Sequence, residues 1–82
     1  MKFDRITIEP GKMNGQPCIR GMRITVKILL EALAALGSQA ELIRQYPDLE
    51  PEDVRQALLF GAAMIADEEV ELPHTAGPAL AS

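Results

Sequence analysis

The sequence predicts a mainly α-helical fold in which an N-terminal β-hairpin precedes a three-helix bundle of the helix-turn-helix, homeodomain-like kind. Residues 3–24 combine alternating apolar and polar positions with turn-forming pairs, whereas apolar residues recur at helical spacing from residue 26 onward. Two short breaks divide the helical part into three segments. Because the chain has 82 residues, of which 48% are hydrophobic and 24% charged, we expect one globular domain over residues 1–68.

The hairpin is expected from two short strands. Residues 3–9 alternate with the period of a half-buried strand, which places Ile6 and Ile8 on the same side. The Asn14-Gly15 pair favours a tight turn, because both residue types tolerate a positive φ. Residues 16–19 then form the returning strand.

The first two helices are expected at about residues 26–36 and 39–46. Thr25 is a suitable N-cap for the first helix, and Gly37 is a suitable residue to end it. Residues 38–41 read Ser-Gln-Ala-Glu, the pattern of a capping box in which the serine and glutamate side chains satisfy reciprocal backbone donors.

The third helix is expected at about residues 51–67. Pro51 suits the first helical position, and Leu49 and Val54 have the spacing of a hydrophobic staple across the helix start. Residues 69–82 are acidic and then rich in Ala, Gly, Pro and Ser, a composition typical of a flexible tail.

The third helix also predicts self-association, because its second half is apolar all round. One face is expected to pack on the first two helices; its members are Val54, Ala57, Leu58, Gly61, Ala62 and Ile65. The opposite face predicts a homodimer interface; its members are Leu59, Phe60, Ala63 and Met64. The alternative is that the β segment of the same chain folds over this second face.

The charges of the chain are divided between its two ends. Residues 1–27 carry six Lys and Arg against two Asp and Glu, a net of +4, whereas residues 28–82 carry two against ten, a net of −8. The overall net charge is −4. We therefore expect the basic N-terminal part and the acidic C-terminal part to attract different partners.

A cluster of basic residues in the front half is the candidate binding surface. It comprises Arg5, Arg20, Arg23 and Lys27, the last three of which surround Gly21, where a further turn is expected. Their side chains suit DNA phosphates or the carboxylates of a protein partner. The alternative is that they cap backbone carbonyls or pair with acidic residues of the same chain.

Other functions find little support in the sequence. A single cysteine, Cys18, and a single histidine, His74, predict no zinc site and no Cys-His nucleophile, so we expect neither a metal, a cofactor nor an enzyme. In a helix-turn-helix protein the start of the third helix reads the bases. Here that position carries Glu50, Glu52 and Asp53, whose negative charges DNA phosphates would repel, so we expect this helix to be a poor DNA reader. The N-terminus lacks the apolar stretch of a signal peptide, which favours a soluble, cytoplasmic protein.

Several motifs together resemble a known bacterial family. They are Arg5-Ile6-Thr7-Ile8, the segment Gly15-Gln16-Pro17-Cys18-Ile19-Arg20-Gly21-Met22-Arg23-Ile24, and Tyr46-Pro47-Asp48-Leu49 before Pro51-Glu52-Asp53-Val54. Over about residues 3–68 the chain resembles the domain-of-unknown-function family 433. Members commonly have Thr at the position of Met22 and Ser or Thr at that of Glu50, so this chain lacks a favourable N-cap there.

The resemblance implies a function that composition and spacing do not. The family is regarded as antitoxin-like, with a helix-turn-helix fold and members that often accompany a toxin with a PIN-type ribonuclease domain. It therefore predicts a type II antitoxin that binds its toxin directly and represses its own operon. A stand-alone DNA-binding regulator and a dimeric interaction module without DNA binding are the alternatives.

Overall fold

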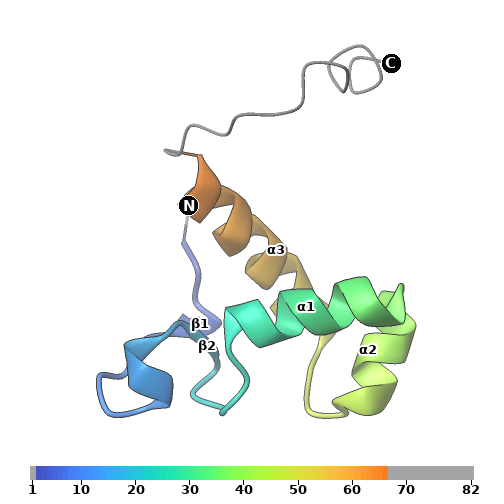
Figure 1. Ribbon diagram of the computed structural model, residues 1–82, viewed down its shortest axis with the longest axis horizontal. Helices are drawn as coiled ribbons and strands as arrows, with labels where there is room; N and C mark the ends of the chain where they lie inside the picture. Colours follow the sequence, from blue (N-terminus) through green and yellow to red (C-terminus); the bar gives the residue numbers. More distant parts are fainter. Residues whose placement is uncertain (1, 67–82) are drawn as a thin grey trace.

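A computed structural model describes residues 2–66 and confirms the mainly helical fold with an N-terminal hairpin (Figure 1). Its elements are β1 (Ile6–Thr7), a 3₁₀ turn (Met13–Gly15), β2 (Cys18–Ile19), α1 (Val26–Leu36), α2 (Gln39–Gln45) and α3 (Pro51–Ile65). The first helix has its predicted bounds, and the second and third end slightly earlier than predicted. The tail predicted for residues 69–82 lies outside the described residues.

The strands β1 and β2 pair antiparallel, in the register Ile6–Ile19 and Thr7–Cys18. The prediction that Ile8 shares a buried side with Ile6 is wrong, because Ile6 packs against the core whereas Ile8 is 61% exposed. In this register the residue opposite Ile8 is Pro17, whose carbonyl points away from β1 and accepts from the N–H of Val26 at 2.9 Å. The β1–β2 ladder ends at the Thr7–Cys18 pair.

The strand β2 is also paired on its other side, by the residues that lead into α1. Cys18 forms an antiparallel bridge with Thr25, and the N–H of Ile19 donates to the carbonyl of Ile24 at 2.9 Å. We call residues 3–25, which contain β1, β2 and the turns around them, the N-terminal unit. Ile19 is completely buried, so β2 lies at the centre of this unit. The predicted turn at Asn14-Gly15 is confirmed, since both residues have positive φ.

The caps of α1 are as predicted, and the capping box of α2 is only half formed. The Thr25 hydroxyl accepts a hydrogen bond from the α1 backbone at 3.0 Å, and Gly37 ends the helix with a φ of +83°. At α2 the Ser38 hydroxyl accepts from the N–H of Glu41 at 3.1 Å. The Glu41 carboxylate instead pairs with Arg44, one turn farther along the helix.

The core lies where β2 and the three helices meet. Its buried apolar members are Ile19, Val26, Leu29, Leu42, Leu49, Val54 and Ala57. The predicted staple is confirmed, because Leu49 and Val54 are each only 2% exposed. None of the helices within residues 2–66 is both long and apolar enough to span a bilayer.

Only part of the predicted inward face of α3 is buried. Val54 and Ala57 lie in the core, but Leu58 is 48% exposed, Ile65 is 56% exposed and Ala62 is also exposed, so the prediction is wrong for these three residues. In Figure 1, α3 rises obliquely from the α1–α2 pair, and its last turns extend beyond that pair. Side chains on those turns therefore have no helix of the same bundle to cover them.

Candidate functional site

The carboxylate of Asp53, in the first turn of α3, joins that helix to the N-terminal unit. Asp53 is completely buried. Arg20 donates to it from Nε at 3.0 Å and from Nη2 at 2.9 Å, and Arg5 donates from Nη1 at 3.2 Å. The backbone N–H of Glu50 donates a further bond at 2.8 Å. Because a planar guanidinium matches a carboxylate with two hydrogen bonds, the pairing fixes the orientation of Arg20 as well as its charge.

Both arginines make further contacts within the chain. Arg5 also pairs with the carboxylate of Glu50, and Nη2 of Arg20 donates to the backbone carbonyl of Asp48 at 2.6 Å. For these two residues the structure shows the internal alternative, in which they pair with acidic residues and cap a carbonyl. Partner binding by Arg5 or Arg20 stays a prediction, and such a partner would have to compete with Asp53.

The environment of Asp53 favours its charged form. Burial by itself would raise the pKa of the Asp53 carboxyl, but hydrogen bonds from Arg20, from the Glu50 amide and from Arg5 outweigh it. The net effect is a pKa below the ordinary value for an aspartic acid. The carboxylate therefore stays ionised throughout the neutral range and into mild acid.

This lowered pKa predicts a specific loss of stability in acid. A carboxyl whose pKa is lower in the folded than in the unfolded state contributes fully above the unfolded value of about 3.9, and loses its contribution as the pH falls through the folded value. We expect the stability difference between the wild type and Asp53→Asn to be constant from pH 7 to about pH 5 and to shrink below about pH 4. Urea unfolding at each pH measures it, and a difference independent of pH would contradict the assignment.

The loop between β2 and α1 is held at several points and exposes Arg23. Arg20 and Gly21 have φ values of +45° and +71°, and the N–H of Met22 donates to the Ile19 carbonyl at 2.8 Å, which closes a tight turn. The N–H of Gly21 donates to the Thr7 hydroxyl at 2.8 Å. The Lys12 ammonium donates to the carbonyl of Gly21. These bonds and the Arg20–Asp53 pair restrain the loop, so Arg23 projects from a defined backbone.

The other two predicted cations remain at the surface. Arg23 is exposed and forms no ion pair among residues 2–66. Lys27, on the first turn of α1, is also exposed and pairs with Glu31 at 2.8 Å. Surface pairs of this kind contribute little to stability, so Lys27 can exchange Glu31 for a partner. The structure thus brings Arg5 and Arg20 together and leaves Arg23 and Lys27 outside their network.

The acidic start of α3 is occupied by contacts within the chain. Glu50 pairs with Arg5, and Glu52 pairs with Arg55 at 2.9 Å. Asp53 is buried against the two arginines. In the helix-turn-helix arrangement this is the end that reads bases. It offers carboxylates and, among the described residues, no cation without an acidic partner. That α3 reads DNA poorly stays a prediction.

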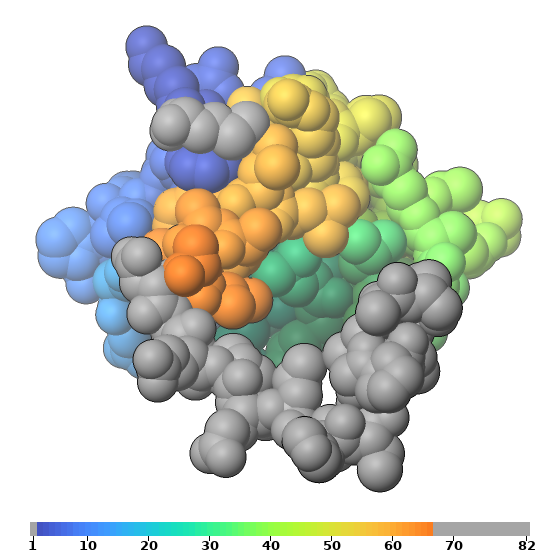
Figure 2. All heavy atoms as spheres, turned by 90° about the horizontal axis from the view of Figure 1, so that it is seen from above, coloured from blue at the N-terminus to red at the C-terminus, as the bar shows by residue number. Residues whose placement is uncertain are grey.

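The N-terminal segment covers part of the α3 face predicted to form a dimer. The backbone N–H of Arg5 donates to Oε1 of Gln56 at 3.0 Å, and Nε2 of Gln56 donates to Asp4 at 2.6 Å. The ring of Phe3 meets that of Phe60 edge to face, with centroids 5.2 Å apart. In Figure 2 the atoms of α3, coloured yellow to orange, lie between the N-terminal segment and α1. The alternative in which the β segment folds over α3 is therefore observed at Phe60.

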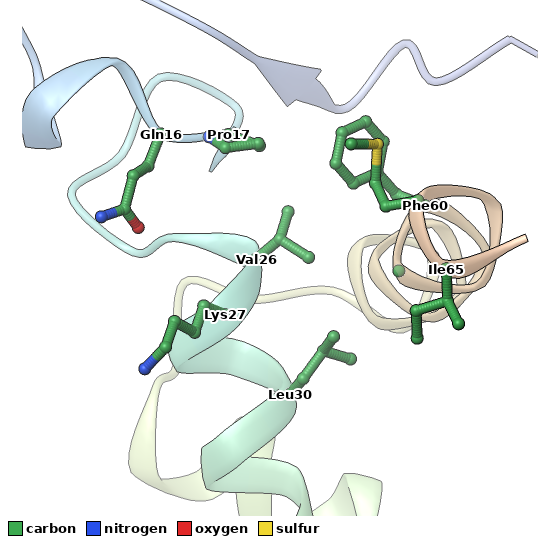
Figure 3. A pocket seen from close by; sticks show the side chains of 9 residues that line it. Gln16, Pro17, Val26, Lys27, Leu30, Phe60 and Ile65 are labelled. Atoms are coloured by element: carbon green, nitrogen blue, oxygen red, sulfur yellow. The ribbon is translucent and has the colours of Figure 1, made fainter. Parts of the chain in front are cut away.

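An apolar groove of about 310 Å³ opens between α1 and the last turns of α3 (Figure 3). We call it the α1–α3 groove. Its lining residues are Gln16, Pro17, Val26, Lys27, Leu30, Phe60, Gly61, Met64 and Ile65. Of the four residues predicted for a dimer interface, Phe60 and Met64 line this groove, whereas Leu59 and Ala63 do not. Met64 is 61% exposed.

Metal ligation has no candidate in the part of the chain that the structure describes. There, no three side chains of the types His, Cys, Asp or Glu gather in a way that would hold an ion. Cys18 is a buried free thiol, as expected of a small apolar core residue.

These features define a small, mainly helical domain. Its N-terminal unit is joined to the start of α3 by the ion pairs of Asp53, and its β2–α1 loop exposes Arg23. A family model described as a protein of unknown function (DUF433) matches residues 6–61, and the protein belongs to this family. The resemblance stated from the sequence is thereby confirmed. No curated protein and no solved structure gives a significant match.

The roles of Asp53 and Gln56 were not predicted from the sequence. Acidic residues in a first helical turn have a sufficient local explanation in the helix dipole, so Asp53 gave no sign of being buried. The signal in the sequence was the uneven distribution of charge, since the basic residues 1–27 and the acidic residues 28–82 of one small domain can neutralise each other. It predicts attraction between the two halves but not which residues meet.

Proposed function

We propose that this protein is the antitoxin of a type II toxin-antitoxin module, acting as a homodimer in the bacterial cytoplasm. It neutralises a PIN-like ribonuclease by direct binding and catalyses no reaction itself. The observation that carries the proposal is the Arg23 loop, in which an exposed guanidinium projects from a turn restrained by its neighbours. The antitoxin-like character of the family that the chain resembles supports the same function.

The chemistry of the loop suits an acidic nuclease site. Nucleases that depend on divalent cations hold them with clustered carboxylates. A guanidinium can pair with such carboxylates through two hydrogen bonds and so compete with the cation. Because the backbone of the loop is already ordered, binding has to order only the Arg23 side chain. Arg20 has less of this freedom, since Asp53 and the Asp48 carbonyl accept from its Nε and Nη2 groups.

Co-expression with the product of the adjacent gene tests the proposal. We expect the two proteins to co-purify as a stable complex, and we expect the purified chain to suppress RNA cleavage by the partner. The measurement is ribonuclease activity against the molar ratio of the two proteins. An adjacent product that neither binds the chain nor loses ribonuclease activity in its presence would overturn the proposal.

The contact itself is tested by charge reversal at Arg23. We expect Arg23→Glu to weaken the complex by at least about tenfold, which corresponds to roughly 1.4 kcal/mol. Arg44→Glu is the matched control, because Arg44 is a highly exposed arginine on α2, outside the loop, and the substitution changes the charge equally. Calorimetry or surface binding gives both affinities. Equal losses in the two variants would show that only net charge matters and would contradict a contact at Arg23.

Repression of its own operon is a second candidate function, favoured by the same exposed cations. Because the start of α3 carries acidic residues, DNA would meet Arg23 and Lys27 rather than that helix. We expect binding to the promoter that weakens with salt and with Arg23→Ala. A gel-shift titration at several salt concentrations measures this, and no promoter binding at low salt would remove the repressor role.

A further inference from the structure

The α1–α3 groove is an apolar surface that the described part of the chain leaves open. Val26 and Leu30 of α1 form one wall, and Phe60 and Ile65 of α3 form the other (Figure 3). Met64 of α3 also lines the groove. Met64 and Ile65 are 61% and 56% exposed. Contiguous exposed apolar surface of this kind marks an interaction site more often than chance.

The groove exists because α1 and α3 approach closely at one point and then diverge. That point is Gly61, where an added Cβ would lie 3.0 Å from Cδ1 of Leu30. One turn farther along α3, Met64 and Ile65 have no α1 side chain close enough to bury them. The shape is thus set by packed helices, and an occupant finds a preformed site.

The charge around the groove indicates the chemistry of its occupant. Lys27 stands at the rim, with a side chain that is 70% exposed. An occupant should therefore combine an apolar end with nearby carboxylates. The chain itself has this combination, because Met64 and Ile65 are followed in sequence, after Ala66, by Asp, Glu and Glu at residues 67–69.

A second copy also avoids repulsion between like charges. The stretch Gln56–Ala66 contains no charged residue, so two α3 helices can approach each other without unfavourable pairs. Ala62 is small and exposed, which permits close contact between helices. In a two-fold dimer each copy must offer both the groove and the group that fills it, and the end of α3 takes part in both.

We propose that the α1–α3 groove is the dimer interface and that each copy inserts the Met64–Ile65 end of α3 into the groove of the other. The sequence that directly follows this inserted end is acidic at residues 67–69, which is complementary in charge to Lys27 at the rim of the groove. This inference rests on the homodimer in the proposed function but not on toxin binding. It keeps Met64 from the face expected from the sequence, adds Ile65 and Leu30, and leaves out Leu59 and Ala63.

Sedimentation of the full chain, from about 1 to 100 µM, tests the interface. The key variant is Ile65→Glu, which places a charge in the groove, and the matched control is Ala63→Glu on the neighbouring face of the same helix. We expect a wild-type dimer, an unchanged dimer for Ala63→Glu, and a dissociation constant raised at least about tenfold for Ile65→Glu. Circular dichroism confirms that each variant is folded.

The outcomes separate this inference from the antitoxin proposal. A chain that stays monomeric overturns it, and so does a dimer that Ala63→Glu disrupts but Ile65→Glu does not. Groove occupation by the toxin instead, seen as loss of toxin binding in Ile65→Glu with an unchanged dimer mass, also overturns it. Lys27→Glu serves as a second variant, because this exposed residue tolerates substitution. It should weaken the dimer, and an unchanged dissociation constant would contradict the predicted charge contact.

Discussion

Replacing Asp53 with Ala is expected to destabilise the protein by about 3–5 kcal/mol, because the change leaves two arginines without their shared buried partner. Arg20 loses its paired hydrogen bonds, Arg5 loses one of two acceptors, and the N–H of Glu50 loses its acceptor. A domain of this size has a total stability of only about 5–15 kcal/mol. A loss of that magnitude is therefore a large fraction of the total stability.

Urea unfolding followed by circular dichroism measures the effect. Asp48→Ala is the matched control, since it removes an exposed carboxylate that forms no ion pair within residues 2–66. We expect the control to change the unfolding free energy by less than about 0.5 kcal/mol. Similar effects in the two variants would show that Asp53 contributes only net charge and that the network does not hold α3 to the N-terminal unit.

Leu42→Ala is expected to destabilise the fold by about 2–5 kcal/mol, because the Leu42 side chain is completely buried where the three helices meet. Leu58→Ala removes the same atoms from a residue that is 48% exposed, and we expect a loss below about 1 kcal/mol. The pair isolates the effect of burial, since the chemical change is identical.

The Leu58 variant also tests which face of α3 points inward, with Leu42 of α2 as the buried reference. Regular helical spacing alone placed Leu58 on the inward face, whereas the structure exposes it. Unfolding should be measured at a protein concentration below that of dimer formation, so that the monomer fold alone is compared. Equal losses for the two leucines would support the inward face predicted from the sequence and contradict the structure at this helix.

The helices and their ends were predictable because local rules determine them. The Thr25 cap, the left-handed Gly37 and the staple of Leu49 and Val54 each involve residues only a few positions apart. Spacing along one helix, however, does not say how far a neighbouring helix extends. The exposure of Ile65 follows from where α3 leaves the bundle, and no local pattern specifies that direction.

The binding site was predictable only as a set of candidates. The sequence identified the basic cluster and both of its possible roles, but choosing between them requires contacts across the chain. Arg20 and Asp53 are 33 positions apart and meet only in the folded protein. Arg23, with the same side chain and a position only slightly later, remains outside that pair. The two arginines lie on either side of Gly21 in sequence, in a turn where Arg20 and Gly21 have positive φ, and no local pattern indicates which of them pairs with Asp53.

Arg20 is paired with Asp53 inside the protein, whereas Arg23 is exposed at the surface. This difference underlies both the expected loss of stability in Asp53→Ala and the proposed toxin contact at Arg23. Nuclear magnetic resonance of the guanidinium Nε–H groups tests it most directly. We expect a slowly exchanging Arg20 signal, because its Nε donates to Asp53, and a rapidly exchanging, mobile signal from Arg23. Asp53→Ala should make Arg20 resemble Arg23. Equally mobile signals from both residues in the wild type would contradict the account.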